Sequence, residues 1–123
     1  MHLLLIAVGG GLGSMARYLA AGAVHRFAPP FFPYGTFVVN VTGCAVFGLL
    51  AGLANERGMI GVEGRAFLLI GVLGGYTTFS TFGFETVELL RTARVGAALA
   101  NACGQVIVGI LAVWAGTVLS RLL

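Results

Sequence analysis

The residues best able to do chemistry in this chain are neutral hydrogen-bonding side chains gathered inside an apolar stretch. Residues 71–83 read GVLGGYTTFSTFG, in which a glycine pair precedes threonine, serine and phenylalanine residues. This string is a poor continuous helix, because the glycine pair and the run of hydroxyl residues both weaken it, so it predicts a helix break. A break at membrane depth survives only where protein buries it or where it lines a wet cavity. The freed carbonyls of such a break can coordinate a cation.

Other polar side chains lie inside apolar stretches where a partnerless polar group would be costly. Asn40 and Thr42 occupy the second stretch, and Asn101 and Gln105 occupy the last one. Because Asn101 and Gln105 are four residues apart, they lie on one helix face. These amides and hydroxyls are therefore candidate functional groups.

Charged side chains near these stretches allow more than one interpretation. Arg17 either extends its head to the membrane interface or attracts anions into a vestibule. Glu85 and Glu88 either pair with Arg17, face a vestibule or are simply solvated near the end of a span. The histidines, His2 and His25, are expected at the interface and receive no role.

The composition places most of the chain in lipid. The 123 residues are 59% hydrophobic and 9% charged, with a mean hydropathy of +1.01. A soluble domain of this size carries about a quarter charged residues. The net charge of +3 comes from arginines scattered singly, which form no basic patch for nucleic acid. Cys44 and Cys103 lie in apolar stretches without metal-ligand spacing and are interpreted as small buried residues.

Hydrophobic segments predict an all-α integral membrane protein with a single domain over residues 1–123 and a retained first segment. A span needs about 20 largely apolar residues. Four segments qualify, and the third contains the expected break: residues 3–24, 35–53, 64–90 and 95–119. Between the first two, Pro29, Pro30 and Pro33 exclude regular helix, and Phe31, Phe32 and Tyr34 suit an interfacial belt.

The arginines are balanced across the predicted membrane. One side carries Arg26, Arg91 and Arg94, and the other carries Arg57, Arg65 and Arg121. Orientation follows an excess of positive charge on cytoplasmic loops, and here that excess is close to zero. The balance predicts dual topology and antiparallel dimers, with a single orientation as the alternative. Glycine pairs such as Gly9 with Gly13 and Gly48 with Gly52 predict close helix packing.

Three motifs resemble the Fluc (CrcB-type) fluoride channels over nearly the full length of the chain. The first is GGLGSMARY at residues 10–18, the second is GTFVVNVTG at residues 35–43, and the third is GGYTTFSTF at residues 74–82. The resemblance implies passive export of fluoride across the cell membrane by an antiparallel homodimer with two pores at its interface. It also implies a structural Na⁺ at the dimer centre, bound by backbone carbonyls of Gly74 and Thr77.

The same resemblance assigns residues to the pore. It implies that Asn40 lines the pore, that Phe79 and Phe82 present ring edges to the ion, and that Ser80 and Thr81 are pore-side hydroxyls. The fourth span has no comparable motif, so Asn101 and Gln105 are carried over only weakly. Neutral donors suit conduction of a strongly hydrated anion, because an ion must both bind and leave. Aromatic edges carry the positive part of the ring quadrupole.

Other functions fit the residues less well. A small multidrug transporter would share the four-span, dual-topology architecture, but it requires a carboxylate in the first span, and none is present. A structural subunit of a larger complex would explain the glycines and leave the polar third span without a purpose. An enzyme is not expected, because the chain has no Asp and neither His lies near a nucleophile or metal cluster.

Overall fold

The computed structural model describes residues 1–123 as helices joined by short loops. In chain order they are α1 (His2–Phe27), α2 (Tyr34–Asn55), α3 (Val62–Arg65), the π-helix η1 (Ala66–Leu73), α4 (Gly74–Tyr76), α5 (Phe79–Arg91) and α6 (Val95–Ser120). Four helical segments are long and apolar enough to cross a membrane: His2–Phe27, Tyr34–Asn55, Val62–Arg91 and Val95–Ser120. The predicted spans are confirmed; the first three helices are a few residues longer than the sequence indicated, and the fourth is one residue longer.

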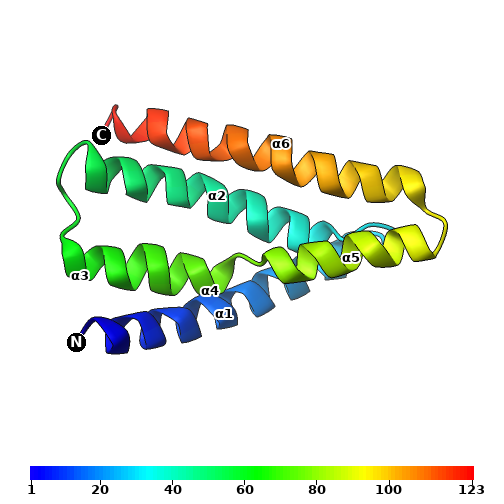
Figure 1. Ribbon diagram of the computed structural model, residues 1–123, viewed down its shortest axis with the longest axis horizontal. Helices are drawn as coiled ribbons and strands as arrows, with labels where there is room; N and C mark the ends of the chain where they lie inside the picture. The colour runs from blue at the N-terminus through cyan, green and yellow to red at the C-terminus, as the bar shows by residue number, and fades with distance from the viewer.

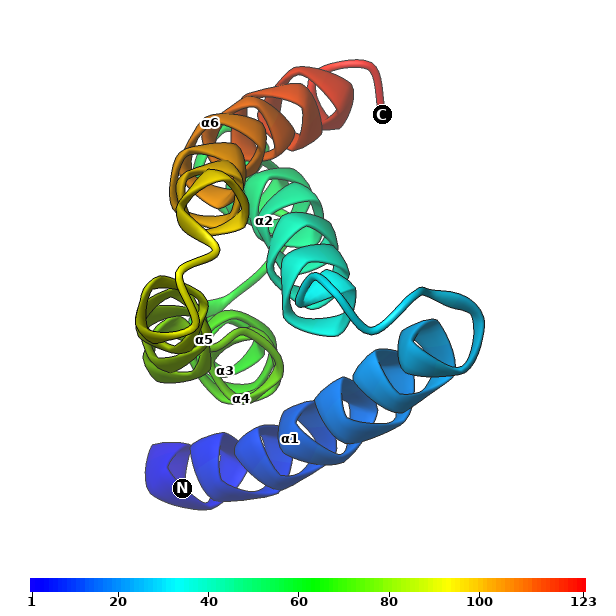
Figure 2. The ribbon, with the colours of Figure 1, turned by 90° about the vertical axis from the view of Figure 1, so that its right-hand side faces the viewer.

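The helices run roughly along one axis, with both chain termini at the same end (Figure 1). α2 and α6 lie side by side along most of their lengths, while α1 packs against η1 and α4. Seen from the opposite end, α2 lies between α6 and α1 (Figure 2). Arg26, in the last turn of α1, and Arg94, just before α6, are therefore at one end, and the loop containing Arg57 is at the other, with the C-terminal Arg121. The arrangement keeps the arginines balanced between the two ends.

Apolar side chains cover the outside of the molecule, while its interior is small. Large hydrophobic residues such as Leu3, Tyr18 and Trp114 are 83%, 79% and 66% exposed. The fully buried side chains with the largest volumes are Val39, Asn101 and Ser120, two of which are polar. This distribution suits lipid as the surrounding solvent, because apolar surface carries no penalty there.

Glycines allow the helix backbones to touch. A Cβ on Gly48 or Gly116 would overlap backbone atoms of the partner helix in the α2–α6 pair, and a Cβ on Gly13 would overlap the Val72 carbonyl in the α1–η1 pair. Close backbone approach at small residues is how helices associate in lipid. The predicted role of Gly9, Gly13, Gly48 and Gly52 in packing is confirmed, since a Cβ at each would come too close to a neighbouring element.

The third span is assembled from pieces. It begins as a short α-helix, continues as η1 and α4, and resumes as α5 after two extended residues, Thr77 and Thr78. Wide π-turns are rare and often occur at functional sites. The predicted break is confirmed, but it lies just after the glycine pair, because Gly74 and Gly75 remain helical within α4.

Arginine side chains fasten the end of the molecule where the termini lie. Arg65 donates to the Ala54 carbonyl, to the Asn55 side-chain oxygen and to the Ile60 carbonyl. Ala54 and Asn55 form the last turn of α2, whose carbonyls have no partners within the helix. Arg65 therefore acts as a C-terminal cap supplied by α3.

Candidate functional site

The break in the third span is the centre of the polar groups. Thr77 and Thr78 are extended, with φ/ψ of −82°/158° and −150°/115°. Thr78 caps the new helix α5, because its hydroxyl accepts a hydrogen bond from the Thr81 backbone N–H at 3.3 Å. Threonine is well suited to this position, since it favours extended backbone and is a good N-cap.

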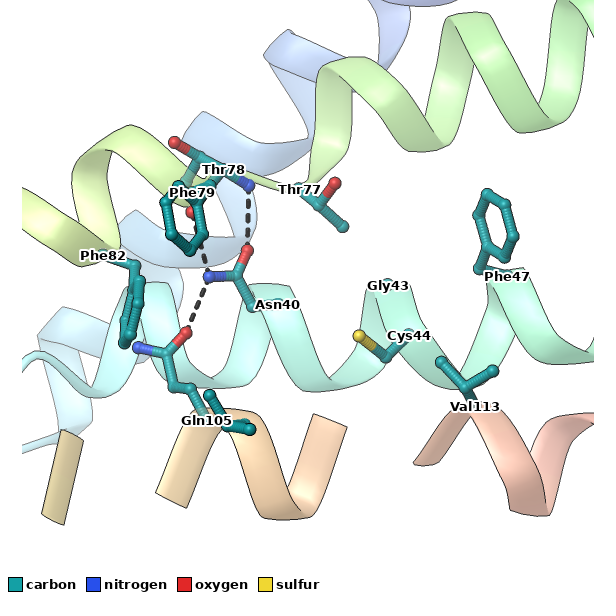
Figure 3. A pocket seen from close by; sticks show the side chains of 11 residues that line it. Asn40, Gly43, Cys44, Phe47, Thr77, Thr78, Phe79, Phe82, Gln105 and Val113 are labelled. Carbon is teal, nitrogen blue, oxygen red and sulfur yellow. Dashed lines mark hydrogen bonds between the residues drawn. The ribbon is translucent and has the colours of Figure 1, made fainter. Parts of the chain in front are cut away.

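Asn40 holds the broken backbone by hydrogen-bonding as a peptide group would. Its Nδ2 donates to the Thr78 carbonyl at 3.0 Å, and its Oδ1 accepts from the Thr78 backbone N–H at 2.9 Å (Figure 3). The side chain of α2 thus satisfies both backbone groups that the break removes from the helix ladder. Unpaired, these groups would be costly at membrane depth. The structure therefore brings Asn40 and the predicted break together.

From Asn40, hydrogen bonds continue through side chains of α6 to α5. Asn40 Nδ2 donates to Gln105 Oε1 at 2.7 Å, Gln105 Nε2 donates to Asn101 Oδ1 at 2.8 Å, and Asn101 Nδ2 donates to Thr86 Oγ1 at 2.9 Å. We call Asn40, Gln105, Asn101 and Thr86 the amide relay. Asn101 is completely buried and Gln105 is 8% exposed. A buried network whose members satisfy one another is rigid and specific.

The amide relay includes two residues that the motifs assigned only weakly and one residue that the sequence did not predict. Asn101 and Gln105, which the motifs reached only weakly, lie in the same network as Asn40. Thr86 was missed by the sequence reasoning, although a hydroxyl one turn beyond Phe82 in an apolar span was a signal. Its hydroxyl donates to the Phe82 carbonyl at 2.8 Å, which ties the relay to the helix that carries both phenylalanines.

A cavity of about 300 Å³ lies beside Asn40 and the break (Figure 3). Its lining combines Asn40, Gln105, Phe79 and Phe82 with apolar side chains, and no charged residue takes part. The two phenyl rings are 5.5 Å apart between centroids and inclined by 47°. Phe79 is 82% exposed, so the aromatic wall faces the outside of the chain. The structure thus brings the predicted aromatic pair beside the predicted amides.

Arg17 lies at the other side of the break. Its Nη1 donates to the Thr77 carbonyl at 3.3 Å, and it lines a second cavity of about 360 Å³. Thr78, Thr81 and Glu85 line the same cavity. The guanidinium of Arg17 contacts the break, so the interpretation in which it extends to the membrane interface is wrong.

The remaining hydroxyls are distributed outside the cavity beside Asn40. Ser80 and Thr81 are exposed, and Thr81 lines the Arg17 cavity. Both hydroxyls approach the Thr78 hydroxyl, at 3.5 Å and 3.0 Å respectively. Thr42 donates to the Val38 carbonyl one turn earlier and contacts the Tyr76 hydroxyl at 3.0 Å.

The two carboxylates of α5 have different partners. Glu85 Oε1 accepts from the Thr36 hydroxyl at 2.7 Å. Glu88 pairs with Arg91 at 3.1 Å on the exposed helix surface. Neither forms an ion pair with Arg17, so the interpretation in which they pair with it is wrong; Glu85 lines the Arg17 cavity, and Glu88 does not.

The carbonyls of Gly74 and Thr77 fit a monovalent cation in their chemistry. Both lie next to the break, where Thr78 directs its N–H to Asn40 rather than along the helix. Thr77 shares its carbonyl with Arg17, and a carbonyl oxygen has a second lone pair. A hard cation takes more oxygen ligands than these two carbonyls, so further ligands would have to come from elsewhere.

The geometry suits weak binding of an anion without its water shell. Gln105 has two N–H donors and uses one for Asn101, and its nitrogen lies beside Phe82 in Figure 3. The ring edges of the phenylalanine pair offer further positive partial charge. Without a cation in the cavity lining, such a site can bind an anion and release it.

Comparison with known proteins places these features in a family. Residues 4–117 match the family model described as "CrcB-like protein, Camphor Resistance (CrcB)". A protein of Solibacter usitatus is 47% identical over 121 residues, which cover 98% of this chain and 99% of that protein. A protein of Methylobacillus flagellatus is 45% identical over 116 residues, which cover 94% and 91%. Each of these two relatives is named "Fluoride-specific ion channel FluC".

Proposed function

The chain belongs to the CrcB-like protein family, and from that premise we propose that it is a fluoride-selective channel, a multi-pass protein of the cell membrane that lets F⁻ leave the cytoplasm passively. The observation that carries the proposal is the cavity at the break, where amides and phenyl rings meet without a charged side chain. Fluoride is small and strongly hydrated, so its water must be replaced by donors that still let it go. Ion conduction also leaves no role for a catalytic residue.

The cavity offers an ion ring edges and one free amide N–H. Phe79 and Phe82 line it, and the free N–H of Gln105 lies beside Phe82. Asn40 also lines the cavity, but both of its N–H groups are committed, to the Thr78 carbonyl and to Gln105 Oε1, so it holds the Gln105 amide in place. A fixed donor loses little entropy when an ion arrives, and a narrow wall of ring edges disfavours larger chloride.

The chain forms an antiparallel homodimer with two pores at its interface in this proposal. The support is the exposure of the pore wall, since Phe79 is 82% exposed and a second copy would enclose it. The balance of arginines at the two ends removes the usual bias toward one orientation. A structural Na⁺ at the dimer centre would then be held by the Gly74 and Thr77 carbonyls of both copies, and its charge would fasten the two breaks together.

Passive export is useful to a cell because hydrogen fluoride crosses membranes uncharged and dissociates in the more alkaline cytoplasm. A leak for F⁻ down its gradient relieves that accumulation without an energy source. The alternatives are a proton-coupled exporter and a structural subunit of a larger complex. They differ from a channel in needing a proton gradient or a partner protein.

Fluoride efflux from liposomes tests the proposal. Purified protein is reconstituted alone, and release of F⁻ is followed with an ion-selective electrode, with chloride as the comparison anion. We expect rapid F⁻ release, little Cl⁻ release, and loss of F⁻ release in Phe82→Ile. Phe27→Ile is the matched control, because Phe27 is 91% exposed and lines neither polar cavity. If correctly inserted wild-type protein releases no fluoride, the channel proposal is overturned. The requirement for a proton gradient or a partner subunit should then be tested.

A further inference from the structure

Two cavities meet at one pair of side chains near the loop end of α1. The Arg17 cavity, of about 360 Å³, reaches from the break toward this end. A second cavity, of about 470 Å³, lies under the proline-rich connection between α1 and α2 and extends to Arg94. His25 and Glu85 are the residues that line both cavities. These two side chains therefore lie where the two cavities meet.

The imidazole of His25 packs against α2 at Gly35, where the lack of a side chain leaves room for the ring. A Cβ on Gly35 would lie 2.7 Å from His25 Cε1 and 3.0 Å from Nε2, so only glycine leaves room for the ring there. The next residue, Thr36, donates to Glu85 Oε1 at 2.7 Å. One turn of α2 therefore holds both the histidine ring and the carboxylate in place.

Glu85 lacks a partner for its second oxygen. Oε2 is buried and forms no hydrogen bond within the chain, whereas Oε1 is satisfied by Thr36. A buried carboxylate oxygen without a donor is costly, which indicates that a donor or positive charge joins it in some state of the protein. His25 is the other residue that lines both cavities, and a histidine side chain can change its charge near neutral pH.

Other charged and titratable groups also face these cavities. On α1, Arg17 and Tyr18 face the inner cavity, and on α5, Glu88 faces the outer cavity while paired with Arg91. Arg94, before α6, also lines the outer cavity. Among the side-chain types present, histidine is the one that responds to pH near neutrality.

We propose that His25 is a positioning residue for fluoride at the mouth of the pathway, where its protonation opposes Glu85 and admits the anion. This inference rests on the proposed channel function. Neutral His25 leaves the carboxylate of Glu85 to repel anions, whereas an imidazolium balances that charge and offers an additional donor. Fluoride conduction through the protein is therefore faster at pH 6.0 than at pH 8.0. Export is then fastest under the acidic conditions that load cells with hydrogen fluoride.

The chain offers a matched control, because His2 and His25 are its two histidines. F⁻ efflux is measured with the same pH on both sides of the membrane, at pH 6.0 and 8.0, after subtracting protein-free liposomes, which leak hydrogen fluoride. We expect wild type and His2→Gln to conduct about fivefold faster at pH 6.0, the scale of one unit charge acting across a few ångströms of water. His25→Gln should keep the pH 8.0 rate at both values.

His25→Arg tests the same inference with a charge that does not titrate, and it conducts at the higher rate at both pH values if the inference holds. Equal rates for wild type at pH 6.0 and 8.0 would overturn the role of His25 and leave the channel itself standing. A pH response that survives in both His25 variants would overturn it in the same way. A wild type silent at both pH values would overturn the proposed function, and this inference with it.

Discussion

The glycine contacts and the amide relay hold helices together in opposite ways. Along α2 and α6 the helices associate because side chains are absent, and Gly48 and Gly116 let one backbone touch the other. At the break the helices associate because side chains are present, and Asn40 replaces hydrogen bonds that the backbone of Thr78 has lost. The first region supplies packing, and the second supplies a cavity lined by amides and phenyl rings.

The comparison explains why the polar region can be rigid although its backbone is broken. Close contact between α2 and α6 fixes the distance between Asn40 and Gln105, whose amides are 2.7 Å apart. The same contact buries Asn101 completely. The relay therefore depends on the glycine contacts, whereas the glycine contacts do not depend on the relay. Substitutions in the two regions should differ accordingly.

The largest effect is expected from Gly48→Leu, which breaks the packing region. A Cβ here already overlaps the backbone of Val113, and no side-chain movement can relieve a clash between two backbones. Overpacking costs about 1–3 kcal/mol in well-packed interiors, and a backbone clash lies at the upper end. We expect loss of most folded protein, measured as the monodisperse fraction in detergent by size-exclusion chromatography. Gly96→Leu is the control, because nothing lies within 4 Å of a Cβ there.

Normal yield of Gly48→Leu, with fluoride flux preserved, would show that α2 and α6 are not held together by backbone contact. It would also separate the two regions, because the relay would then stand without the packing assigned to it.

Asn40→Asp breaks the polar region while keeping the size of the side chain. The carboxylate can still accept from the Thr78 N–H, but it faces the Thr78 carbonyl and the Gln105 oxygen without a donor. We expect folded protein at reduced yield and fluoride efflux at least about 100-fold slower, because repulsion and an added negative charge both oppose an anion. Efflux from liposomes is the measurement, with Thr42→Val as a control on the same helix. Wild-type flux in Asn40→Asp would remove Asn40 from the pathway.

Asn101→Leu sharpens the comparison, because it removes the relay where it is most deeply buried. Gln105 and Thr86 each lose a partner, and a partnerless buried polar group costs about 1–3 kcal/mol. We expect a lower unfolding temperature and fluoride efflux reduced about tenfold, since Gln105 turns more freely beside Phe82. Cys103→Ala is the control on α6, because Cys103 is exposed; the interpretation of Cys103 as a buried residue is wrong, since its side chain lies on the outer face of the helix. An unchanged efflux rate would limit the relay to a structural role.

The sequence predicted the regular parts of this fold and the members of its site more readily than their contacts. Hydropathy and length predicted the spans, and the glycine pair with its threonines predicted a break, because both depend on local chemistry. The break itself follows Tyr76 rather than Gly74. Glycine permits a break, but the position of the break depends on Asn40, which hydrogen-bonds the backbone groups that the break leaves without helical partners. That contact joins residues 38 apart in the chain, and no local pattern contains it.

The same limit applies to the charged residues. Arg17 and Glu85 are each conspicuous in an apolar span, yet their partners are the Thr77 carbonyl and the Thr36 hydroxyl rather than each other. Opposite charges suggest an ion pair, but the packing of α1 against α4 decides which group reaches which. The contact between His25 and Gly35 could not be predicted from the sequence either, because it depends on a glycine of another helix that leaves room for the ring.

The smallest effect is expected at the end of the molecule, away from both regions. Arg121 donates two hydrogen bonds to Glu56, at 2.9 and 3.1 Å, and this hydrogen bonding lowers the pKa of the Glu56 carboxyl below its ordinary value of 4.5. Because the pKa is lower in the folded state, the pair stabilises the protein above that ordinary value, and its contribution is lost as the pH falls through the folded pKa. The pair is exposed, so its contribution is small.

Glu56→Gln should therefore lower the unfolding temperature slightly at pH 7, and the difference from wild type should be smaller at pH 3, because the contribution of the pair is lost as the pH falls through the folded pKa of Glu56. Fluoride efflux should equal that of wild type at pH 7, because Glu56 lies on the loop between α2 and α3, outside every cavity near the break. Thermal unfolding in detergent at the two pH values measures the first effect, with Glu63→Gln as the control for an acidic residue without an arginine partner. A large change in efflux would mean that the loop between α2 and α3 takes part in conduction. The comparison of the glycine contacts with the amide relay would then have to include this loop as a third region.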